Sequence, residues 1–478
     1  MVSRIDVVVE GGLVVAGGTV SPATVAISEG KILALLAPGM LPAEAADARR
    51  VDATGKIVMP GVVDAHVHMR NFNLQADSYV SLSAAAAFGG VTTIIPYQQG
   101  KMGMPVKEFL TVLRDEGEAE SLVDFAMHCR LQAPERGVTA QFADAFDLGV
   151  TSFKMFMAYR KRGIMWDDYS LYEAMDYIGR QGGMFCCHAE NGDVIDYLED
   201  RYQSEGRYTP ENYLAVRPPE AEAEATFRVA NIAKLANCPL YLVHMSTGQG
   251  IAIGHQAQLA GQKVFIETCP HYLTLTADEM KRQCGRTKIA PPLREKHEVD
   301  AVWQAVENGV VQVIGSDHAP WPLENKMLPP ERFPEIFFGA PTIETMLPLL
   351  YSEGVAKGRI DLPRLVELLC ENPARIFGLA PRKGTIAVGA DADLVLLDPN
   401  AEWRVEAKDM HSEAGYTPYE GWLVRGKVVA TMVRGEFVMQ DGRLVQSPGY
   451  GRYLPRQPER RLAGSPRIIP GGVVGYGA

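Results

Sequence analysis

Residues 56–68 read KIVMPGVVDAHVH, an apolar run that ends in polar side chains. A run of this kind is typical of a strand buried on both faces in a parallel β-sheet. Seven more such runs follow, with helical patterns between them, and eight β/α units predict a (β/α)8 barrel, also called a TIM barrel. The seven runs are VTTIIPY (91–97), LVDFAMHCR (122–130), VTSFKMFMAY (150–159), GGMFCCHAEN (182–191), CPLYLVHMS (238–246), KVFIETCPHY (263–272) and VVQVIGSDHA (310–319).

Short β-rich pieces separated by glycines occupy residues 5–36, and matching pieces occupy residues 389–445. Since the first set cannot bury itself alone, we expect one small discontinuous β-sandwich that both ends of the chain build together. Beyond it the chain is rich in Pro, Gly and Arg, which is typical of a disordered tail or of an arm on a neighbouring subunit. The predicted limits are residues 1–55 and 381–446 for the sandwich, 56–380 for the catalytic barrel and 447–478 for the tail.

The composition of the 478 residues excludes several classes of protein. A net charge of −11 argues against general affinity for nucleic acid, which needs a basic surface. No apolar run approaches the roughly 20 residues of a membrane span, and residues 1–10 do not resemble a signal peptide. The seven cysteines are scattered and odd in number, as is usual for reduced thiols. These features predict a cytoplasmic protein with neither a nucleic-acid nor a membrane partner.

Polar residues stand at the ends of the predicted strands, where a barrel places its active site. His66 and His68 are two positions apart, so on a strand they face the same side and can chelate one metal ion. An HxH pair alone is a weak signal, since chance surface pairs are about as common, but its place at the end of the first strand favours a metal site. Asp317 ends the eighth strand, beside the first in a closed barrel, and can bind the same ion.

Lys154 lies within an apolar strand, and lysine is almost never buried without a reason. One interpretation is a lysine whose ammonium group reaches solvent. The other is a lysine that carbon dioxide has converted to an anionic carbamate, which can bridge two cations. His188 and His244 each close a later apolar strand. One such histidine is usually a core residue, whereas two after a candidate bridging lysine favour a second metal site.

The order HxH, Lys, His, His, Asp resembles the binuclear amidohydrolase superfamily, in its hydantoinase, dihydropyrimidinase, allantoinase and dihydroorotase branch. Residues 153–159 (FKMFMAY) and 188–193 (HAENGD) are similar to the hydantoinase and dihydropyrimidinase group in particular. The resemblance covers nearly the whole chain. It implies a homotetramer that opens a small cyclic amide or imide by attack of a metal-bridged hydroxide.

The same resemblance implies two divalent metal ions. Zinc is expected because imidazole and carboxylate ligands suit it, and manganese or cobalt are alternatives. Single-metal deaminases share the barrel but do not use a bridging lysine, so Lys154 argues against them. The implied ligands are His66, His68, Asp317 and the carbamate of Lys154 for the first ion, and the same carbamate, His188 and His244 for the second.

Two residues acquire catalytic roles by this resemblance. Asp317 is expected to accept the proton of the hydroxide and to pass it to the departing ring nitrogen. Tyr159, five residues after Lys154, matches the family's tyrosine that hydrogen-bonds the oxyanion. Ordinary packing at the strand end is the alternative for Tyr159.

Two positions depart from the hydantoinase pattern. Ala290 stands where these enzymes usually carry a serine before Pro-Pro-Leu-Arg, and Phe338 stands where they carry an asparagine. Backbone groups at Ala290 and Gly339 are expected to contact the substrate instead. The loss of two polar contacts favours a ring with an aryl or alkyl substituent over dihydrouracil.

Other features are similar to neighbouring branches. Arg70, two residues after His68, resembles the dihydroorotase arginine that holds a substrate carboxylate, although it could equally pair with an acid of its own chain. Residues 268–273 (TCPHYL) look like allantoinase. Allantoinase and dihydroorotase activities therefore remain alternatives. A non-catalytic dihydropyrimidinase-like scaffold is a further one, although such scaffolds lose metal ligands that this chain retains.

Overall fold

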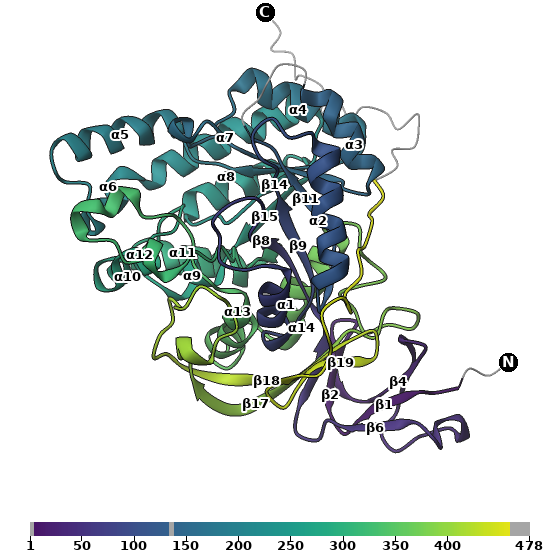
Figure 1. The fold of residues 1–478 in the computed structure, drawn as a ribbon. Helices are drawn as coiled ribbons and strands as arrows, with labels where there is room; N and C mark the ends of the chain where they lie inside the picture. Colours follow the sequence, from purple (N-terminus) through teal and green to yellow (C-terminus); the bar gives the residue numbers. More distant parts are fainter. Residues whose placement is uncertain (1–3, 133–137, 459–478) are drawn as a thin grey trace, which may run out of the picture.

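The computed structural model describes residues 4–132 and 138–458. Helices surround a central parallel sheet, and two further sheets lie at one end of the molecule (Figure 1). Within the described residues, none of the helices combines the length and the apolar character needed to cross a membrane.

The central sheet is parallel and almost entirely buried. Its hydrogen-bonded order is β10-β9-β11-β12-β13-β14-β15-β16, and β8 pairs with β9. An isolated parallel bridge also joins Val67, at the end of β8, to His318, just after β16. The strands are β8 (Val62–Val67), β9 (Val91–Gln98), β10 (Asp124–Phe125), β11 (His128–Arg130), β12 (Ser152–Phe156), β13 (Met184–His188), β14 (Leu240–Leu242), β15 (Val264–Thr268) and β16 (Val313–Ile314).

Each of the eight predicted apolar runs contributes to this sheet, so the predicted mixed α/β architecture with a parallel sheet is confirmed. The first run divides at Gly61, where a Cβ would lie 2.0 Å from Thr92 Oγ1. Only its second half, β8, belongs to the central sheet, whereas β7 (Ile57–Pro60) joins an outer sheet. The run 122–130 likewise gives two short strands in place of one.

The helices follow the strands as the alternating pattern predicts. α4 begins after Asp167, whose side chain accepts a hydrogen bond from Ser170 N, and α7 begins at Pro219 with acidic residues in its first turn. The helices are α1 (Tyr79–Phe88), α2 (Val106–Glu120), α3 (Phe142–Asp147), α4 (Asp168–Arg180), α5 (Gly192–Ser204), α6 (Tyr213–Val216), α7 (Pro219–Ala236), α8 (Gly248–Leu259), α9 (Pro270–Thr274), α10 (Ala277–Gln283), α11 (Lys296–Glu307), α12 (Leu323–Lys326), α13 (Ile343–Leu350), α14 (Leu362–Val366) and α15 (Asn372–Ile376).

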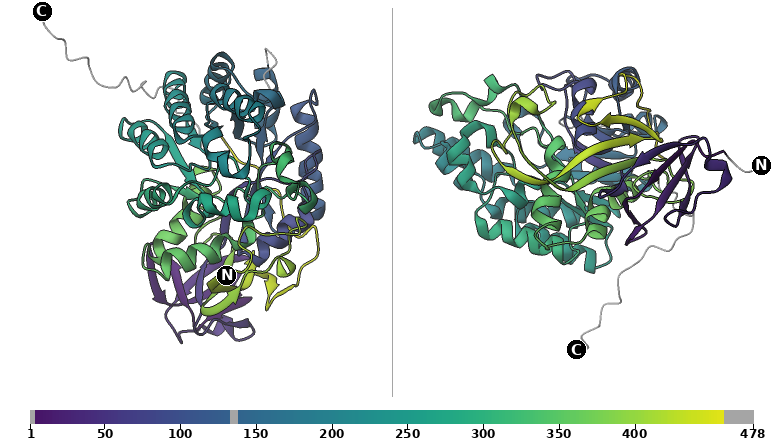
Figure 2. Two further views of the ribbon diagram at one scale, coloured as in Figure 1. Left: turned by 90° about the vertical axis from the view of Figure 1, so that its left-hand side faces the viewer. Right: turned by 90° about the horizontal axis from the view of Figure 1, so that it is seen from below.

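The two outer sheets share one buried apolar cluster, which includes Val9, Val14 and Leu396. One sheet has the order β5-β4-β1-β6 and the other β20-β19-β18-β17-β7-β2-β3, so the second combines strands from near both ends of the chain (Figure 2). Their strands are β1 (Val7–Glu10), β2 (Leu13–Ala16), β3 (Thr19–Pro22), β4 (Thr24–Ser28), β5 (Lys31–Leu36), β6 (Arg49–Asp52), β17 (Leu394–Arg404), β18 (Leu423–Val433), β19 (Glu436–Gln440) and β20 (Arg443–Leu444).

A buried group of charged residues, here called the Lys383 cluster, joins the central sheet to the outer sheets. The Lys383 ammonium lies 2.6 Å from Asp124, 2.6 Å from Asp393 and 3.0 Å from Asp391. Arg434 supplies a second cation to Asp124. All three carboxylates therefore have a cation as partner.

The first part of the predicted tail packs against its own chain. Phe125 N donates to Arg452 O (3.0 Å) and Leu454 N donates to Phe125 O (2.7 Å), so this segment extends the edge of the central sheet at β10. Leu454 and Arg456 are buried. Residues 459–478 of the predicted tail lie outside the described residues.

Candidate metal centre

The end of β8 meets the end of β16 at three polar side chains, His66, His68 and Asp317. Asp317 Oδ1 lies 3.0 Å from His66 Nε2 and 3.4 Å from His68 Nε2. His68 N donates to His318 O (2.6 Å), which holds the two segments together. The three side chains can each offer one ligand atom to a single ion.

His66 is oriented by Glu267, which the sequence reasoning did not identify. The His66 Nδ1 atom lies 2.5 Å from Glu267 Oε1, and the same carboxylate accepts hydrogen bonds from His244 N and the Tyr241 hydroxyl, each at 2.8 Å. A proton held on Nδ1 would leave the Nε2 electron pair available to a metal ion. Gly315 makes room for this carboxylate, since a Cβ there would lie 2.8 Å from Glu267 Oε2.

A second group of side chains adjoins the first. The His188 Nδ1 and His244 Nε2 atoms are 3.0 Å apart, and the rings of His244 and His66 have centroids 5.3 Å apart. Lys154 lies on β12, with its Nζ atom 5.0 Å from the centroid of the Tyr97 ring. His66 packs against that same tyrosine at 4.9 Å. The structure therefore brings all six predicted ligands to one end of the central sheet.

His188 is oriented by a second carboxylate, Glu190. His188 Nε2 lies 2.6 Å from Glu190 Oε2, and Arg217 Nη1 also lies 2.6 Å from that oxygen. Although burial opposes ionisation, Arg217 lowers the pKa of Glu190 to about 2. The ionised carboxylate fixes the proton of His188 on Nε2, so the Nδ1 electron pair points toward His244.

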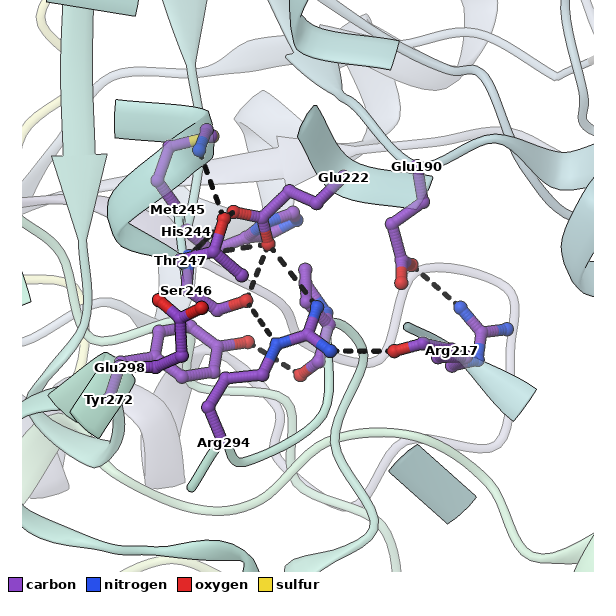
Figure 3. Close-up of polar contacts among 12 residues, drawn as sticks. Glu190, Arg217, Glu222, His244, Met245, Ser246, Thr247, Tyr272, Arg294 and Glu298 are labelled. Carbon is purple, nitrogen blue, oxygen red and sulfur yellow. Dashed lines mark hydrogen bonds and ion pairs between the residues drawn. The ribbon is translucent and has the colours of Figure 1, made fainter. Parts of the chain in front are cut away.

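Arg294 links the segments that follow β13 and β14. Its side chain donates to Ser246 Oγ (3.0 Å) and to Arg217 O (2.6 Å), as Figure 3 shows. Glu222 accepts hydrogen bonds from Ser246 and from the Thr247 hydroxyl, the latter at 2.6 Å. This network supports His244 from one side and the Glu190–Arg217 pair from the other.

The backbone is strained at the site. Tyr159, His244 and Asp317 have positive φ angles of 72°, 42° and 46°, which side chains other than glycine rarely adopt. Such conformations cost about 1 to 3 kcal/mol each and persist only where the surroundings impose them. Here they occur at three predicted site residues.

The pKa values of the ionisable groups at the site depend on burial and on the neighbouring carboxylates. Burial lowers the pKa of His68 to about 4 and that of Lys154 to about 8. Burial would also lower the pKa of His66, but Glu267 and Asp317 raise it to about 9. His66 Nε2 and His244 Nδ1 are buried with no hydrogen-bond partner among the described residues. A divalent cation would satisfy the facing donor atoms, so the residues present fit the metal that the sequence predicts.

The predicted substrate residues divide into two sets. Tyr159 and Phe338 form an aromatic wall next to the second group, since the Tyr159 ring lies 5.0 Å from that of His188 and 5.8 Å from that of Phe338. Tyr213 extends the wall, because its ring stacks on Phe338 at 6.3 Å and its hydroxyl donates to Ile289 O, next to Ala290.

Gly339 and Arg70 are placed differently. Gly339 N donates to Lys288 O (3.0 Å) and Gly339 O accepts from Lys326 Nζ (2.7 Å), so its backbone groups are already engaged within the chain. The Arg70 side chain is exposed, and its charge opposes the effect of burial on the pKa of Glu116 in α2. This arrangement favours the pairing of Arg70 with an acid of its own chain.

The supporting carboxylates and arginines were missed because their partners are distant in sequence. Glu267 lies 201 residues from His66, and Arg217 lies 27 residues from Glu190. The one available signal was the acidic residue inside the apolar run KVFIETCPHY, which a buried strand tolerates only with a partner.

Comparison with known proteins agrees with this site. The amidohydrolase family matches residues 115–438. A D-hydantoinase of Ralstonia pickettii is 37% identical over 95% of this chain and 99% of its own length, and an L-hydantoinase of Paenarthrobacter aurescens is 35% identical over 95% and 98%. The crystal structure of dihydropyrimidinase from Brevibacillus agri has a TM-score of 0.90 at 34% identity, covering 95% of this chain and 100% of that one. The chain is a member of the amidohydrolase family, in the branch of the hydantoinases and dihydropyrimidinases.

Proposed function

We propose that this member of a family of cyclic-amide hydrolases opens the ring of a hydantoin or dihydropyrimidine at a binuclear metal centre. The observation that carries the proposal is the pair of facing donor atoms in each group. His66 Nε2 faces Asp317 Oδ1 at 3.0 Å, and His188 Nδ1 faces His244 Nε2 at 3.0 Å. Two cations side by side would satisfy both pairs.

Lys154 is the proposed bridge between the two ions. Burial lowers the pKa of its amine to about 8, so a larger share of neutral amine is present near pH 7 than in an ordinary lysine. The neutral amine adds to carbon dioxide with formation of an N–C bond and loss of one proton, which gives an anionic carbamate. The proposed ligands are His66, His68, Asp317 and the carbamate for one ion, and the carbamate, His188 and His244 for the other. Zinc is the proposed metal, with manganese or cobalt as alternatives.

When bound, the two cations would acidify a water molecule to a pKa of roughly 7 and polarise the ring carbonyl. Asp317 accepts the proton of the attacking water at a carboxylate oxygen and delivers it to the ring nitrogen as the amide bond breaks. Although burial opposes ionisation, His66 and His68 hold the pKa of Asp317 well below its usual value, so the carboxylate is ionised at neutral pH.

Tyr159 supplies a hydrogen bond to the carbonyl oxygen as that oxygen gains negative charge. Burial raises the pKa of its phenol above the usual value, so the hydroxyl stays protonated and can donate. The positive φ of Tyr159 lies at the turn after β12 and fixes the direction of its side chain.

The aromatic wall of Tyr159, Tyr213 and Phe338 is the proposed contact for a substituent on the ring. Apolar surface at Phe338 and Ala290 favours a substituted hydantoin over dihydrouracil by roughly 1 to 3 kcal/mol, the usual effect of a lost polar contact. The test is a turnover screen of the zinc-loaded protein over substituted hydantoins, dihydrouracil, allantoin and dihydroorotate. We expect a substituted hydantoin to have the highest kcat/KM. A higher value for dihydrouracil would indicate an ordinary dihydropyrimidinase, and turnover of no ring would contradict the proposal.

We also propose the arrangement of the barrel and of the β-sandwich. The Val67–His318 bridge supports closure of the central sheet into a (β/α)8 barrel spanning residues 56–380. The β7–β17 pairing supports a discontinuous β-sandwich built from residues 1–55 and 381–446. We also propose a homotetramer in the cytoplasm, and light scattering at micromolar concentration tests the assembly.

A further inference from the structure

Arg130 and Arg162 are two cations at the candidate site for which the proposed reaction has no use. Arg130 ends β11, two positions after His128, so both side chains point to the same side of the strand. His128 faces the inside of the central sheet. Its Nε2 atom lies 2.9 Å from Ala65 O, and its ring stacks on Tyr97 with the ring centroids 4.4 Å apart. Arg130 therefore faces the end of the sheet at which the metal ligands gather.

The Arg130 guanidinium has no anionic partner among residues 4–132 and 138–458. It forms no hydrogen bond or ion pair with any of these residues, and its Nε atom is buried without a partner. The group lies 4.7 Å from the centroid of the Phe156 ring, whose other neighbours include His188 at 5.6 Å. Burial lowers the pKa of Arg130 to about 10, and Arg162 contributes in the same direction. At neutral pH the Arg130 guanidinium is thus a positive charge with no paired carboxylate among the described residues.

Arg162 differs from its two neighbours in the loop after β12. Arg160 pairs with Asp193, and Lys161 pairs with Asp200 at 2.6 Å. Arg162 instead lies over the aromatic wall, 4.6 Å from the Phe338 ring and 5.4 Å from the Tyr159 ring, and forms no ion pair within the described part of the chain. On the same wall, Arg217 is neutralised by Glu190.

An unpaired guanidinium beside an apolar wall suits a particular ligand. A carboxylate forms charge-assisted hydrogen bonds to arginine, and partial burial strengthens them. The carbon atoms that connect such a carboxylate to the ring would lie on Tyr159 and Phe338. Arg70 is exposed and does not offer the same combination.

We propose that Arg130, assisted by Arg162, binds a carboxylate on the ring substituent, so that the preferred substrate is an anionic cyclic amide such as a carboxyalkyl or carboxyaryl hydantoin. This inference rests on the proposed function and names its substrate class. Arg130 acts as a specificity residue for the substituent and takes no part in breaking the amide bond.

The test compares two racemic rings of nearly equal shape, 5-(2-carboxyethyl)hydantoin and its carboxamide, with the zinc-loaded protein. We expect the wild type to prefer the carboxylate by at least about 10-fold in kcat/KM. Arg130→Met should lower kcat/KM for the carboxylate by about 10-fold to 100-fold, as for loss of a charged hydrogen bond, and leave the carboxamide within about 2-fold. Arg130→Lys should keep part of the preference.

Lys161→Met is the control, because it removes a cation of the loop after β12 that already has a partner, and it should leave both rates unchanged. Equal kcat/KM values of the wild type for the two rings would overturn the inference, and so would an equal loss of kcat/KM for both rings in Arg130→Met. Turnover of the carboxamide would still support the proposed function.

Equilibrium binding supplies a readout that does not depend on catalysis. In the Asp317→Asn background, where ring opening is slowed by at least about 100-fold, calorimetry should show that Arg130→Met weakens binding of the carboxylate ring by about 10-fold or more. The binding of the carboxamide should be unchanged. If the wild type opens neither ring, the proposed function fails and this binding difference alone decides the inference. Equal affinities for the two rings would then refute it.

Discussion

Two buried groups of charged side chains in this molecule differ in how their charges are satisfied. In the Lys383 cluster the ammonium lies within 3.0 Å of Asp124, Asp391 and Asp393. At the candidate metal centre, Asp317 faces an unpartnered nitrogen of His66. The carboxylates of the first group are paired with cations of the chain, whereas His66 Nε2 in the second group has no hydrogen-bond partner among the described residues.

The difference separates a structural role from a binding role. Buried polar groups are normally hydrogen-bonded, and an unsatisfied one costs about 1 to 3 kcal/mol. In the Lys383 cluster, ion pairs formed on folding offset this cost. In the group around His66, binding of a ligand would offset it, so this group suits a cation and the Lys383 cluster does not.

The largest expected effect comes from a change at the candidate metal centre. Asp317→Asn should lower kcat by about 100-fold to 10,000-fold, because it removes the proton acceptor and weakens a metal ligand. The thermal unfolding of the metal-free protein should change little, which circular dichroism can check. Near wild-type turnover would show that another residue accepts the proton.

A change in the Lys383 cluster should lower stability and leave turnover unaffected. Lys383→Met should lower the free energy of unfolding by about 3 to 5 kcal/mol, because three buried carboxylates lose their common cation. The kcat of the protein that remains folded should be unchanged. Lys56→Met is the control, since its ion pair with Asp398 is partly exposed and should contribute at most about 1 kcal/mol.

Denaturation in urea, with kcat measured on the same samples, separates these outcomes. A loss of turnover in Lys383→Met without a loss of stability would mean that the cluster supports the site directly, and the distinction between the two groups would fail.

The sequence predicted the residues that end strands better than the residues that support them. His66, His188 and Asp317 each interrupt an apolar run at its end, and the alternation of strands and helices brings such ends together. The division at Gly61 was not predicted, because the close approach of Thr92 to this glycine comes from the neighbouring strand β9. A pattern of local periodicity contains no such contact.

The supporting residues need three-dimensional information for the same reason. Glu267 has its role because β15 brings it within reach of His66 on β8. Arg130 appears in the sequence as an ordinary polar residue after a strand, and only the lack of a partner among the described residues distinguishes it. Residue types at strand ends were therefore predictable, whereas pairings were not.

A smaller effect is expected from the residues that orient the ligands. Glu267→Gln should lower the affinity for the first metal ion by about 10-fold to 100-fold, because a neutral amide accepts a weaker hydrogen bond from the His66 imidazole than a carboxylate does. Glu190→Gln is the matched change at His188 and should weaken the second ion instead. Competition titrations with a chromogenic chelator measure both affinities, and unchanged values in both variants would show that the orienting carboxylates do not matter.

The smallest effect concerns acid stability. Burial opposes ionisation of Asp391, but Lys383 holds its pKa well below the usual value. A carboxyl group with a lowered pKa in the folded protein contributes stability at any pH above its pKa in the unfolded chain, which is about 4. That contribution is lost as the pH falls below this value. Urea denaturation of the metal-free protein between pH 6 and pH 3 should show a steeper fall for the wild type than for Asp391→Asn. Parallel curves would contradict this account of the Lys383 cluster.

In the proposed metal centre, the facing donor atoms of the two groups hold two cations, and a carbamate on Lys154 bridges them. The most direct measurement is a crystal structure of protein purified with zinc and bicarbonate, together with metal analysis of the same sample. We expect two divalent ions per chain and a carbamate on Lys154 in contact with both. A single ion, or an unmodified Lys154 distant from the metal, would contradict it.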